Sequence, residues 1–184
     1  PGRIEVDETL VNAIRSRAGQ VREKIAAAAH RAGRDPEAVR LVVVTKAQPL
    51  EVVRAAAAAG MRLLGENYPE EAVVKIDSMR AEFDVEWHMI GHVQSRKADL
   101  VARNFTMLHS LDSLKLAQRL DRLCAEAGRT LPVLLEFNVG AEESKFGFPA
   151  WEERSWPALL PVLEPILGLP HLRISGLMTM PPFF

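Results

Sequence analysis

The chain of 184 residues is long enough for one domain with a well-buried core, and its 48% hydrophobic and 26% charged residues are ordinary for a globular protein. The formal net charge of -1 provides no overall field that would favour nucleic acid or an anionic membrane. Short basic pairs such as Arg96–Lys97 are interleaved with acidic residues, and we interpret them as solvated helix faces.

The cysteine content and the N-terminus bear on the cellular compartment. The single cysteine, Cys124, excludes an internal disulfide, and its helical surroundings predict a small core or semi-buried residue. No apolar run approaches the roughly 18 residues that a membrane span needs. The N-terminal segment "PGRIEVDETL" is charged and lacks a signal-like apolar stretch. The sequence therefore predicts a cytoplasmic protein.

Helical and strand-like segments alternate along the chain. A long helix is predicted from about Asp7 to Arg34, and Asp35 and Pro36 then form the N-cap and first position of a short turn. Short apolar segments rich in β-branched or aromatic residues predict strands buried on both faces, over residues 40–46, 62–67, 86–91, 107–112, 131–140 and 173–180. Helical patterns lie between them, over residues 49–60, 68–80, 93–104 and 112–128, and Gly60 is a favourable residue for the end of the first of these helices.

The proline-rich stretch from Pro149 to Pro170 is harder to assign. Its prolines would cap or break a helix. We predict one helix that begins after Pro157 and is kinked near Pro161 or Pro165, with Trp151 and Trp156 as packing residues for it.

Strand–helix alternation at intervals of this kind is typical of βαβ units with a parallel sheet, either doubly wound or closed into a barrel. No G-x-G-x-x-G motif follows the first strand, which argues against a dinucleotide-binding half. Polar residues instead follow several strands, which is typical of a barrel mouth: Lys46, Glu66, Asn67, Asp112, Asn138 and Thr179. We count six strands where a (β/α)8 TIM-type barrel needs eight, so the sequence predicts an incomplete barrel or an open sheet.

Lys46 is the residue whose position most clearly indicates a role in chemistry. An ammonium group in an apolar barrel mouth loses hydration, its pKa falls, and the neutral amine can attack a carbonyl to form a Schiff base. Such a lysine serves a Schiff-base aldolase or a carrier of pyridoxal 5'-phosphate (PLP). The alternative is a structural lysine at the strand edge, paired with a carboxylate such as that of Glu66.

Six motifs occur in order along the chain: "VVVTKAQP", "LLGENYPEE", "EWHMIGHVQSRK", "LHSLDS", "NVGAEESKFGF" and "ISGLMTMPP". Together they resemble the PLP homeostasis family, single-domain PLP-binding proteins related to the barrel domain of alanine racemase. The resemblance implies a PLP-binding barrel that covers residues 1–184 as one domain, incomplete at its C-terminus. It implies that Lys46 holds PLP as a Schiff base and that Asn67, His88 and Met178 line the cofactor pocket.

The departures from the family are informative as well. Family members continue through two more βα units that hold the PLP phosphate, and the sequence offers no replacement loop. Racemases of this fold use a tyrosine from a second domain, whereas the only tyrosine here is Tyr68 in the barrel segment. We therefore expect a non-catalytic carrier of PLP, with PLP-dependent apoenzymes as partners, and a monomer if the barrel is complete but association if it is truncated.

Other assignments remain open. A lysine-dependent aldolase on the same barrel could use Glu66 or Asp112 as acid or base, and a racemase-like enzyme is a further alternative. His88 and His92 have the spacing of a zinc pair, but Gly91 interrupts the helical register, so we expect no metal site. The loop around Ser144 and Lys145 either shapes the pocket rim and accepts PLP during transfer, or is a solvated surface loop.

Overall fold

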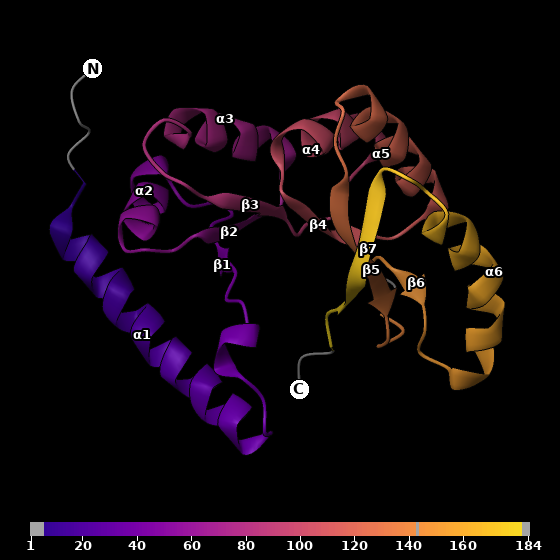
Figure 1. Cartoon of the computed structure of the whole chain (residues 1–184), viewed down its shortest axis with the longest axis horizontal. Helices are drawn as coiled ribbons and strands as arrows, with labels where there is room; N and C mark the ends of the chain where they lie inside the picture. Colours follow the sequence, from indigo (N-terminus) through magenta and orange to yellow (C-terminus); the bar gives the residue numbers. More distant parts are fainter. Residues whose placement is uncertain (1–5, 143, 182–184) are drawn as a thin grey trace. The chain divides into compact units, whose positions relative to one another are not determined.

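The computed structural model describes residues 6–142 and 144–181 and shows helices alternating with strands after a long N-terminal helix (Figure 1). The chain divides into two compact units. Unit 1 comprises the residues up to Gly65 together with Val74–Glu86. Unit 2 comprises Glu66–Val73 and the residues from Trp87 onward.

Unit 1 begins with two helices that pack against each other, α1 (Glu8–Arg31) and α2 (Leu50–Ala58) (Figure 1). The Asp7 side chain caps α1 by accepting a hydrogen bond from the Thr9 backbone N–H at 2.9 Å, which satisfies a donor that the helix leaves unpaired. Val11 of α1 and Ala55 of α2 are buried in the small apolar cluster between them. The run of alanines in α2 thus allows a close helix–helix contact.

The predicted caps in unit 1 are confirmed. Asp35 accepts a hydrogen bond from the Glu37 N–H at 3.0 Å and starts the short 3₁₀ helix η1 (Pro36–Ala38). Gly60 follows α2 with a φ of 91°, a left-handed conformation that glycine adopts without a steric penalty.

The first predicted strand is shorter and more exposed than the sequence indicated. β1 (Val43–Val44) pairs in parallel with β2 (Leu63–Glu66), with Val43 opposite Leu64. All four residues of β2 are buried, whereas Val44 is 49% exposed. The prediction that the strand over residues 40–46 is buried on both faces is therefore wrong, because β1 has a described strand neighbour on its β2 side only.

Helix α3 (Pro69–Met79) follows β2, and a strand β3 (Glu86–Met89) follows α3. Within unit 1, the Glu86 N–H donates to the Arg62 carbonyl at 2.8 Å. Within unit 2, the Ile90 N–H donates to the Glu66 carbonyl at 2.9 Å.

Unit 2 holds the longer part of the parallel sheet. β4 (Met107–Leu111) pairs in parallel with β3 and with β5 (Leu131–Asn138), and β5 also pairs in parallel with β7 (Leu172–Thr179). A two-residue strand, β6 (Phe148–Pro149), lies beside the end of β5. The predicted parallel α/β arrangement is confirmed, and β6 is an element that the sequence did not indicate.

The helices of unit 2 are the crossovers between these strands: α4 (Ala98–Asn104), preceded by the 3₁₀ helix η2 (Ser95–Lys97), then α5 (Leu114–Glu126) and α6 (Trp156–Leu167), preceded by the 3₁₀ helix η3 (Glu153–Ser155). Helix α5 buries one apolar face, made of Leu116, Ala117, Leu120, Leu123 and Cys124. Cys124 is fully buried, as predicted, and burial raises the pKa of its thiol.

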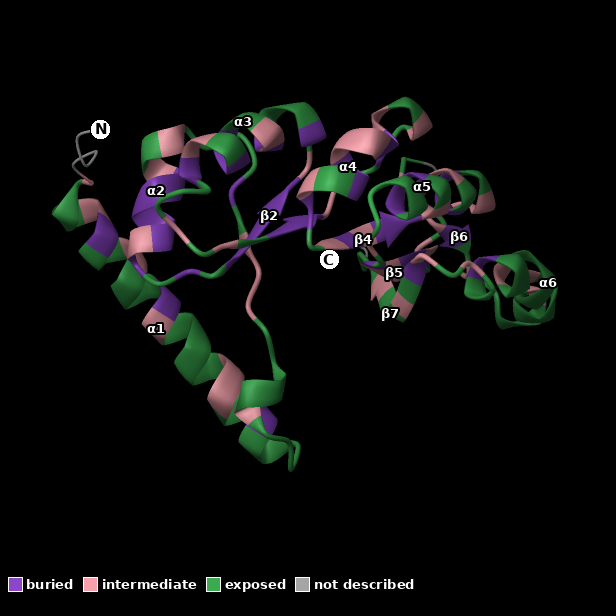
Figure 2. Ribbon diagram, turned by 45° about the horizontal axis from the view of Figure 1, so that its top comes forward, coloured by how far each residue is buried: buried purple, intermediate pink, exposed green. Residues whose placement is uncertain are grey.

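Helix α6 is apolar but exposed, and it is mostly green in Figure 2. Ile166 is its one fully buried residue, whereas Leu160 is 67% exposed. Trp151 and Trp156 leave about half of each side chain in solvent, so they contribute less packing than predicted. Next to α6, β7 alternates half-buried and exposed residues, so the prediction of burial on both faces is wrong for this strand also.

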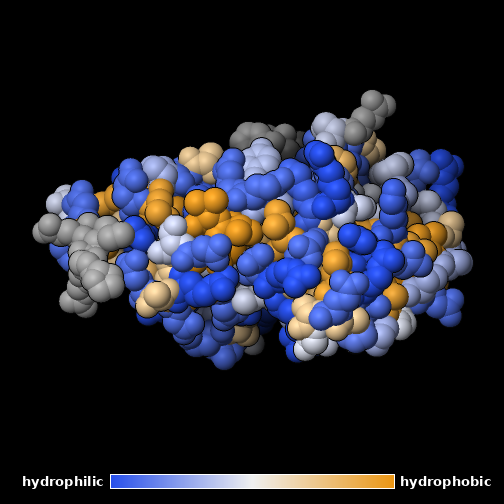
Figure 3. Space-filling model, turned by 90° about the horizontal axis from the view of Figure 1, so that it is seen from above, coloured by the Kyte–Doolittle hydropathy of each residue, from blue (hydrophilic) through white to orange (hydrophobic). Residues whose placement is uncertain are grey.

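Hydrophilic side chains cover much of the face seen from above, and hydrophobic ones are gathered in patches between them (Figure 3). Among the described residues, none of the helices combines the length and the apolar character needed to cross a membrane.

Candidate functional site

Lys46 lies in a tight turn that follows β1. The Gln48 N–H donates to the Thr45 carbonyl at 3.2 Å, so Lys46 and Ala47 are the two central residues of this turn. Ala47 has a φ of 56°, which is uncommon for a residue with a side chain. The turn thus holds Lys46 in a defined position, directly before a strained backbone conformation at Ala47.

Two contacts anchor this turn to the rest of unit 1. The Thr45 N–H donates to the Gly65 carbonyl at 2.9 Å, which extends the pairing of β1 with β2. The Lys75 ammonium of α3 donates to the Thr45 carbonyl at 3.0 Å, and both residues are buried. Lys75 therefore fixes the carbonyl directly before Lys46.

Lys75 is a residue that sequence analysis missed. The signal was present, because Ala72, Ile76 and Met79 are buried and Lys75 lies on the same side of α3. A lysine on the buried side of an amphipathic helix needs an acceptor, since its charge is otherwise costly to bury.

The Lys46 side chain itself is exposed to solvent. Within its own unit, over the residues that the structure describes, its amine has no hydrogen-bond or ion-pair partner. The expectation that its ammonium is dehydrated by an apolar surrounding is therefore wrong. Glu66, the carboxylate suggested as its partner, belongs to unit 2 and is completely buried in β2.

Asn67 follows β2 in unit 2 and is half-buried. Its backbone closely approaches Gly91, where an added Cβ would lie 2.5 Å from the Asn67 carbonyl oxygen. Only glycine fits at position 91, and this requirement explains the "MIG" end of the third predicted strand.

His88 lies within β3 and is buried, and it faces a second histidine. Its Nδ1 is 2.9 Å from Nε2 of His109 in β4, so one imidazole donates a proton and the other accepts it. Burial lowers the pKa of His109, which favours its neutral form. His88 is thus already engaged in a hydrogen bond inside the sheet layer.

His92 has a different partner from His88. Its Nδ1 is 2.8 Å from Oδ2 of Asp112, and the Phe146 ring stacks on its imidazole with centroids 3.6 Å apart. Across residues 6–142 and 144–181, no group of three or more His, Cys, Asp or Glu side chains is arranged to hold a metal ion.

Glu136 in β5 is buried, and its Oε2 has no hydrogen-bond partner among the described residues. Desolvation raises the pKa of this carboxyl, the nearby Asp112 raises it further, and His92 lowers it. Sequence analysis missed this residue because "LLEFN" has the pattern of an ordinary core strand.

Hydrogen bonds and an ion pair hold the loop after β5 in place. The Asn138 side-chain amide donates to the Glu142 carbonyl at 2.9 Å. The Lys145 ammonium lies 2.6 Å from Oε1 of Glu142 and 3.3 Å from the carbonyl oxygens of both Met180 and Pro181. Lys145 therefore connects this loop to the segment that follows β7. Ser144 belongs to the same loop.

Met178 is half-buried in β7, where it lines an apolar groove of about 390 Å³ with Phe137, Val139, Ala150, Trp156, Leu159, Leu160, Leu163, Leu177 and Thr179. Among the predicted polar strand-end residues, Thr179 donates its hydroxyl to the Phe137 carbonyl at 2.8 Å.

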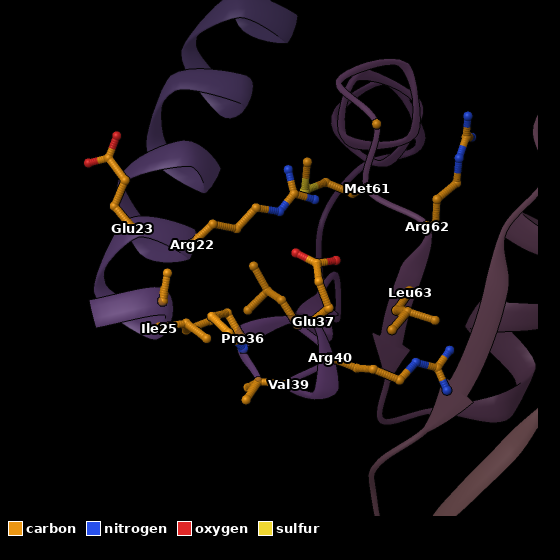
Figure 4. A pocket seen from close by; sticks show the side chains of 13 residues that line it. Arg22, Glu23, Ile25, Pro36, Glu37, Val39, Arg40, Met61, Arg62 and Leu63 are labelled. Atoms are coloured by element: carbon orange, nitrogen blue, oxygen red, sulfur yellow. The ribbon is translucent and has the colours of Figure 1, made fainter. Parts of the chain in front are cut away.

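A pocket of about 500 Å³ lies in unit 1 between α1, η1 and the start of β2 (Figure 4). Arg22 extends across it toward Met61, and the Glu37 carboxylate lies nearby (Figure 4). Leu41 and Met61, which precede β1 and β2, place this pocket at the N-terminal ends of the two strands. Lys46 follows the C-terminal end of β1, where barrel enzymes hold their active sites, so this pocket is not the candidate site.

Comparison with known proteins identifies the family. The model of the family "Alanine racemase, N-terminal domain" matches residues 17–183. A pyridoxal phosphate homeostasis protein of Pseudomonas aeruginosa is 42% identical over 163 residues, which are 88% of this chain and 67% of that protein. The protein of the same name from Escherichia coli K12 is 39% identical over 173 residues, 93% of this chain and 71% of that protein. The chain belongs to the pyridoxal phosphate homeostasis family.

Solved structures agree with this family assignment. PipY of Synechococcus elongatus with PLP bound has a TM-score of 0.72 and 32% identity, and the match covers 93% of this chain and 72% of PipY. A structure described as an unknown protein from Bifidobacterium adolescentis has a TM-score of 0.80 and 32% identity, covering 97% of this chain and 73% of that one. Alanine racemase of Corynebacterium glutamicum, with 20% identity, a TM-score of 0.61 and coverage of 92% and 44%, shows the shared fold alone. The predicted fold class and family are therefore confirmed.

Proposed function

We propose that this member of the PLP homeostasis family binds PLP as a Schiff base on Lys46 and carries it without catalysing a reaction. The observation that carries the proposal is the amine of Lys46, which is exposed on a turn whose backbone is anchored. Bound beside this turn, PLP would supply an aldehyde carbon for the neutral Lys46 amine, and the two amine hydrogens would leave with the aldehyde oxygen as water.

The residues around Lys46 fit the aldehyde end of PLP. Within unit 1, no described carboxylate holds the amine in an ion pair, so the amine is accessible to an incoming aldehyde. Lys75 keeps the preceding carbonyl in place, so the amine starts from a fixed backbone. The PLP-bound structure of PipY, a relative with 32% identity, supports the choice of ligand.

The roles of Asn67, His88 and Met178 as pocket-lining residues stay predictions. His88 is hydrogen-bonded to His109 inside the sheet, so a contact between His88 and a bound cofactor would also affect the His109 imidazole. Met178 lines the apolar groove beside α6.

A carrier is favoured over an enzyme. Racemisation through PLP needs acid–base groups on both faces of the cofactor. Tyr68, the only tyrosine, lies outside β2 and is 53% exposed. For the aldolase alternative, the Asp112 carboxylate is already hydrogen-bonded to His92. Transfer to PLP-dependent apoenzymes, a cytoplasmic location, a single barrel domain over residues 1–184 and a monomeric state stay predictions.

The decisive experiment is reduction of the PLP-treated protein with borohydride, followed by intact mass and peptide mapping. We expect one phosphopyridoxyl adduct, on Lys46, and loss of that adduct in Lys46→Ala. Lys24→Ala is the matched control, because Lys24 is exposed on α1 in the same unit. An adduct spread evenly over Lys24 and other lysines, or one retained in Lys46→Ala, would contradict the proposal.

Catalysis is tested on the same preparation. We expect the PLP-loaded protein neither to racemise alanine nor to cleave aldol substrates above the rate of the Lys46→Ala variant. Turnover that depends on Lys46 would replace the carrier with one of the two enzymatic alternatives.

A further inference from the structure

The outer surface of unit 2 carries a pocket with only one sign of charge. It has a volume of about 390 Å³ and lies between η2 and α5. Its lining side chains are Ser95, Arg96, Lys115, Gln118, Arg119 and Arg122. Four of these six are cations and none is a carboxylate, in a chain whose formal net charge is -1.

The cations on α5 are placed together by the helical repeat. Lys115, Arg119 and Arg122 are spaced by four and three residues and therefore share one face of the helix. The opposite face holds the buried apolar residues, Leu120 and Cys124 among them. Like charges at this spacing repel one another, so the arrangement is unfavourable unless an anion lies between them.

No carboxylate lines this pocket, and four carboxylates of unit 2 are engaged with other partners. Asp99 pairs with Arg103, and Glu70 pairs with Lys97. Asp121 accepts from the His171 N–H at 2.8 Å, and Asp112 is hydrogen-bonded to His92.

The four pocket cations have no such partners. Over the described part of the chain, none of Arg96, Lys115, Arg119 and Arg122 forms an ion pair, and Arg96 donates only to the Gln94 side chain, at 2.8 Å. Arg96 is exposed on η2, as expected for a solvated helix face, and its side chain also lines this cationic pocket.

We propose that this pocket binds a compact polyanion of the polyphosphate class. Guanidinium groups hold phosphate oxygens through paired N–H donors, and three arginines beside one lysine suit a ligand with several adjacent phosphates. The lining contains no aromatic or large apolar side chain that could stack on a base, so the recognised part of the ligand is its phosphate chain. This site goes beyond the proposed PLP carrier function and does not depend on it.

The test is calorimetric titration of the protein with inorganic tripolyphosphate at low ionic strength. We expect saturable binding that weakens as salt is added, because the interaction is mainly between charges. The double variant Arg119→Gln with Arg122→Gln should weaken binding about tenfold or more, since it removes charge-assisted hydrogen bonds. The matched control is Arg103→Gln with Lys24→Gln, which removes the same charge outside the pocket and should leave the affinity nearly unchanged.

Three results would overturn the proposal: no binding, equal weakening in the pocket and control variants, or loss of binding in Lys46→Ala. Circular dichroism verifies that each variant is folded. Because binding is measured without PLP, failure of the pocket and failure of the carrier function give separate results.

Discussion

Polar side chains at the strand ends have opposite environments in the two units. In unit 1, the backbone around Lys46 is anchored by Lys75 and by pairing with β2, whereas the Lys46 amine is exposed. In unit 2, the side chains themselves are engaged: His92 with Asp112, and Asn138 with its own loop. A reactive side chain stays accessible when the hydrogen bonds around it are made by the neighbouring backbone. Polar side chains that hydrogen-bond to one another instead have a structural role.

The largest expected effect comes from removing the anchor in unit 1. Lys75→Met should lower the free energy of unfolding by about 1.5–3 kcal/mol, because a charged, buried hydrogen bond to the Thr45 carbonyl is lost. Urea titration measures this loss, and Lys24→Met serves as the exposed control. The same variant should slow adduct formation on Lys46. Unchanged stability would show that pairing with β2 alone holds the turn.

The corresponding variant in unit 2 is Asn138→Ala. It removes the hydrogen bonds to the Glu142 and Lys145 carbonyls and should lower the free energy of unfolding by about 1–2 kcal/mol. Hydrogen exchange should become faster in residues 140–142 and 144–147, and formation of the reduced PLP adduct on Lys46 should be unaffected. If the Lys46 adduct also decreased, the two strand ends would not be independent.

A smaller effect, which depends on pH, is expected at Glu136. Burial raises its pKa in the folded state, so its contribution to stability is present below the pKa of the unfolded chain and is lost as pH rises through the folded pKa. The side chain in Glu136→Gln is neutral at every pH. This variant should therefore raise the melting temperature at pH values above the folded pKa of Glu136 and change it little at pH values below the unfolded pKa. A stabilisation that is the same at acidic and alkaline pH would contradict the burial of an ionised carboxylate.

The smallest effect is expected from relief of backbone strain. Ala47 and Ala141 both have a φ of 56°, one in each unit. Glycine tolerates this conformation, so Ala47→Gly and Ala141→Gly should each stabilise the protein by at most about 1 kcal/mol. Urea titration of both variants compares the two turns directly. Destabilisation by Ala47→Gly would mean that the side chain contributes contacts that outweigh the strain.

The sequence predicted the architecture well where periodicity and caps carry the information. The Asp35 cap, the glycine after α2 and the order of parallel strands were all expected and are confirmed. Strand β6 was missed because two residues are too few to show a period. The exposure of Val44 was missed because an apolar run indicates burial but does not reveal whether a strand has a neighbour on each side.

The candidate site was predicted only in part. Lys46 could be selected because a lysine after an apolar strand is unusual, but its exposure depends on tertiary packing. Lys75 is 29 residues further along the chain, and its bond to the Thr45 carbonyl follows from how α3 packs, which no local pattern encodes. The His88–His109 pair likewise joins residues of two strands, and its register follows from the parallel pairing of β3 with β4.

The burial of Cys124 makes this residue a natural reporter of breathing motions in unit 2. It is the only cysteine of the chain, it is fully buried on the apolar face of α5, and burial raises its thiol pKa, so the folded form should resist alkylation. The rate at which a thiol reagent labels the protein then measures how often local opening of α5 exposes the thiol. The native chain can be followed in this way without any introduced label, in every variant that leaves position 124 intact.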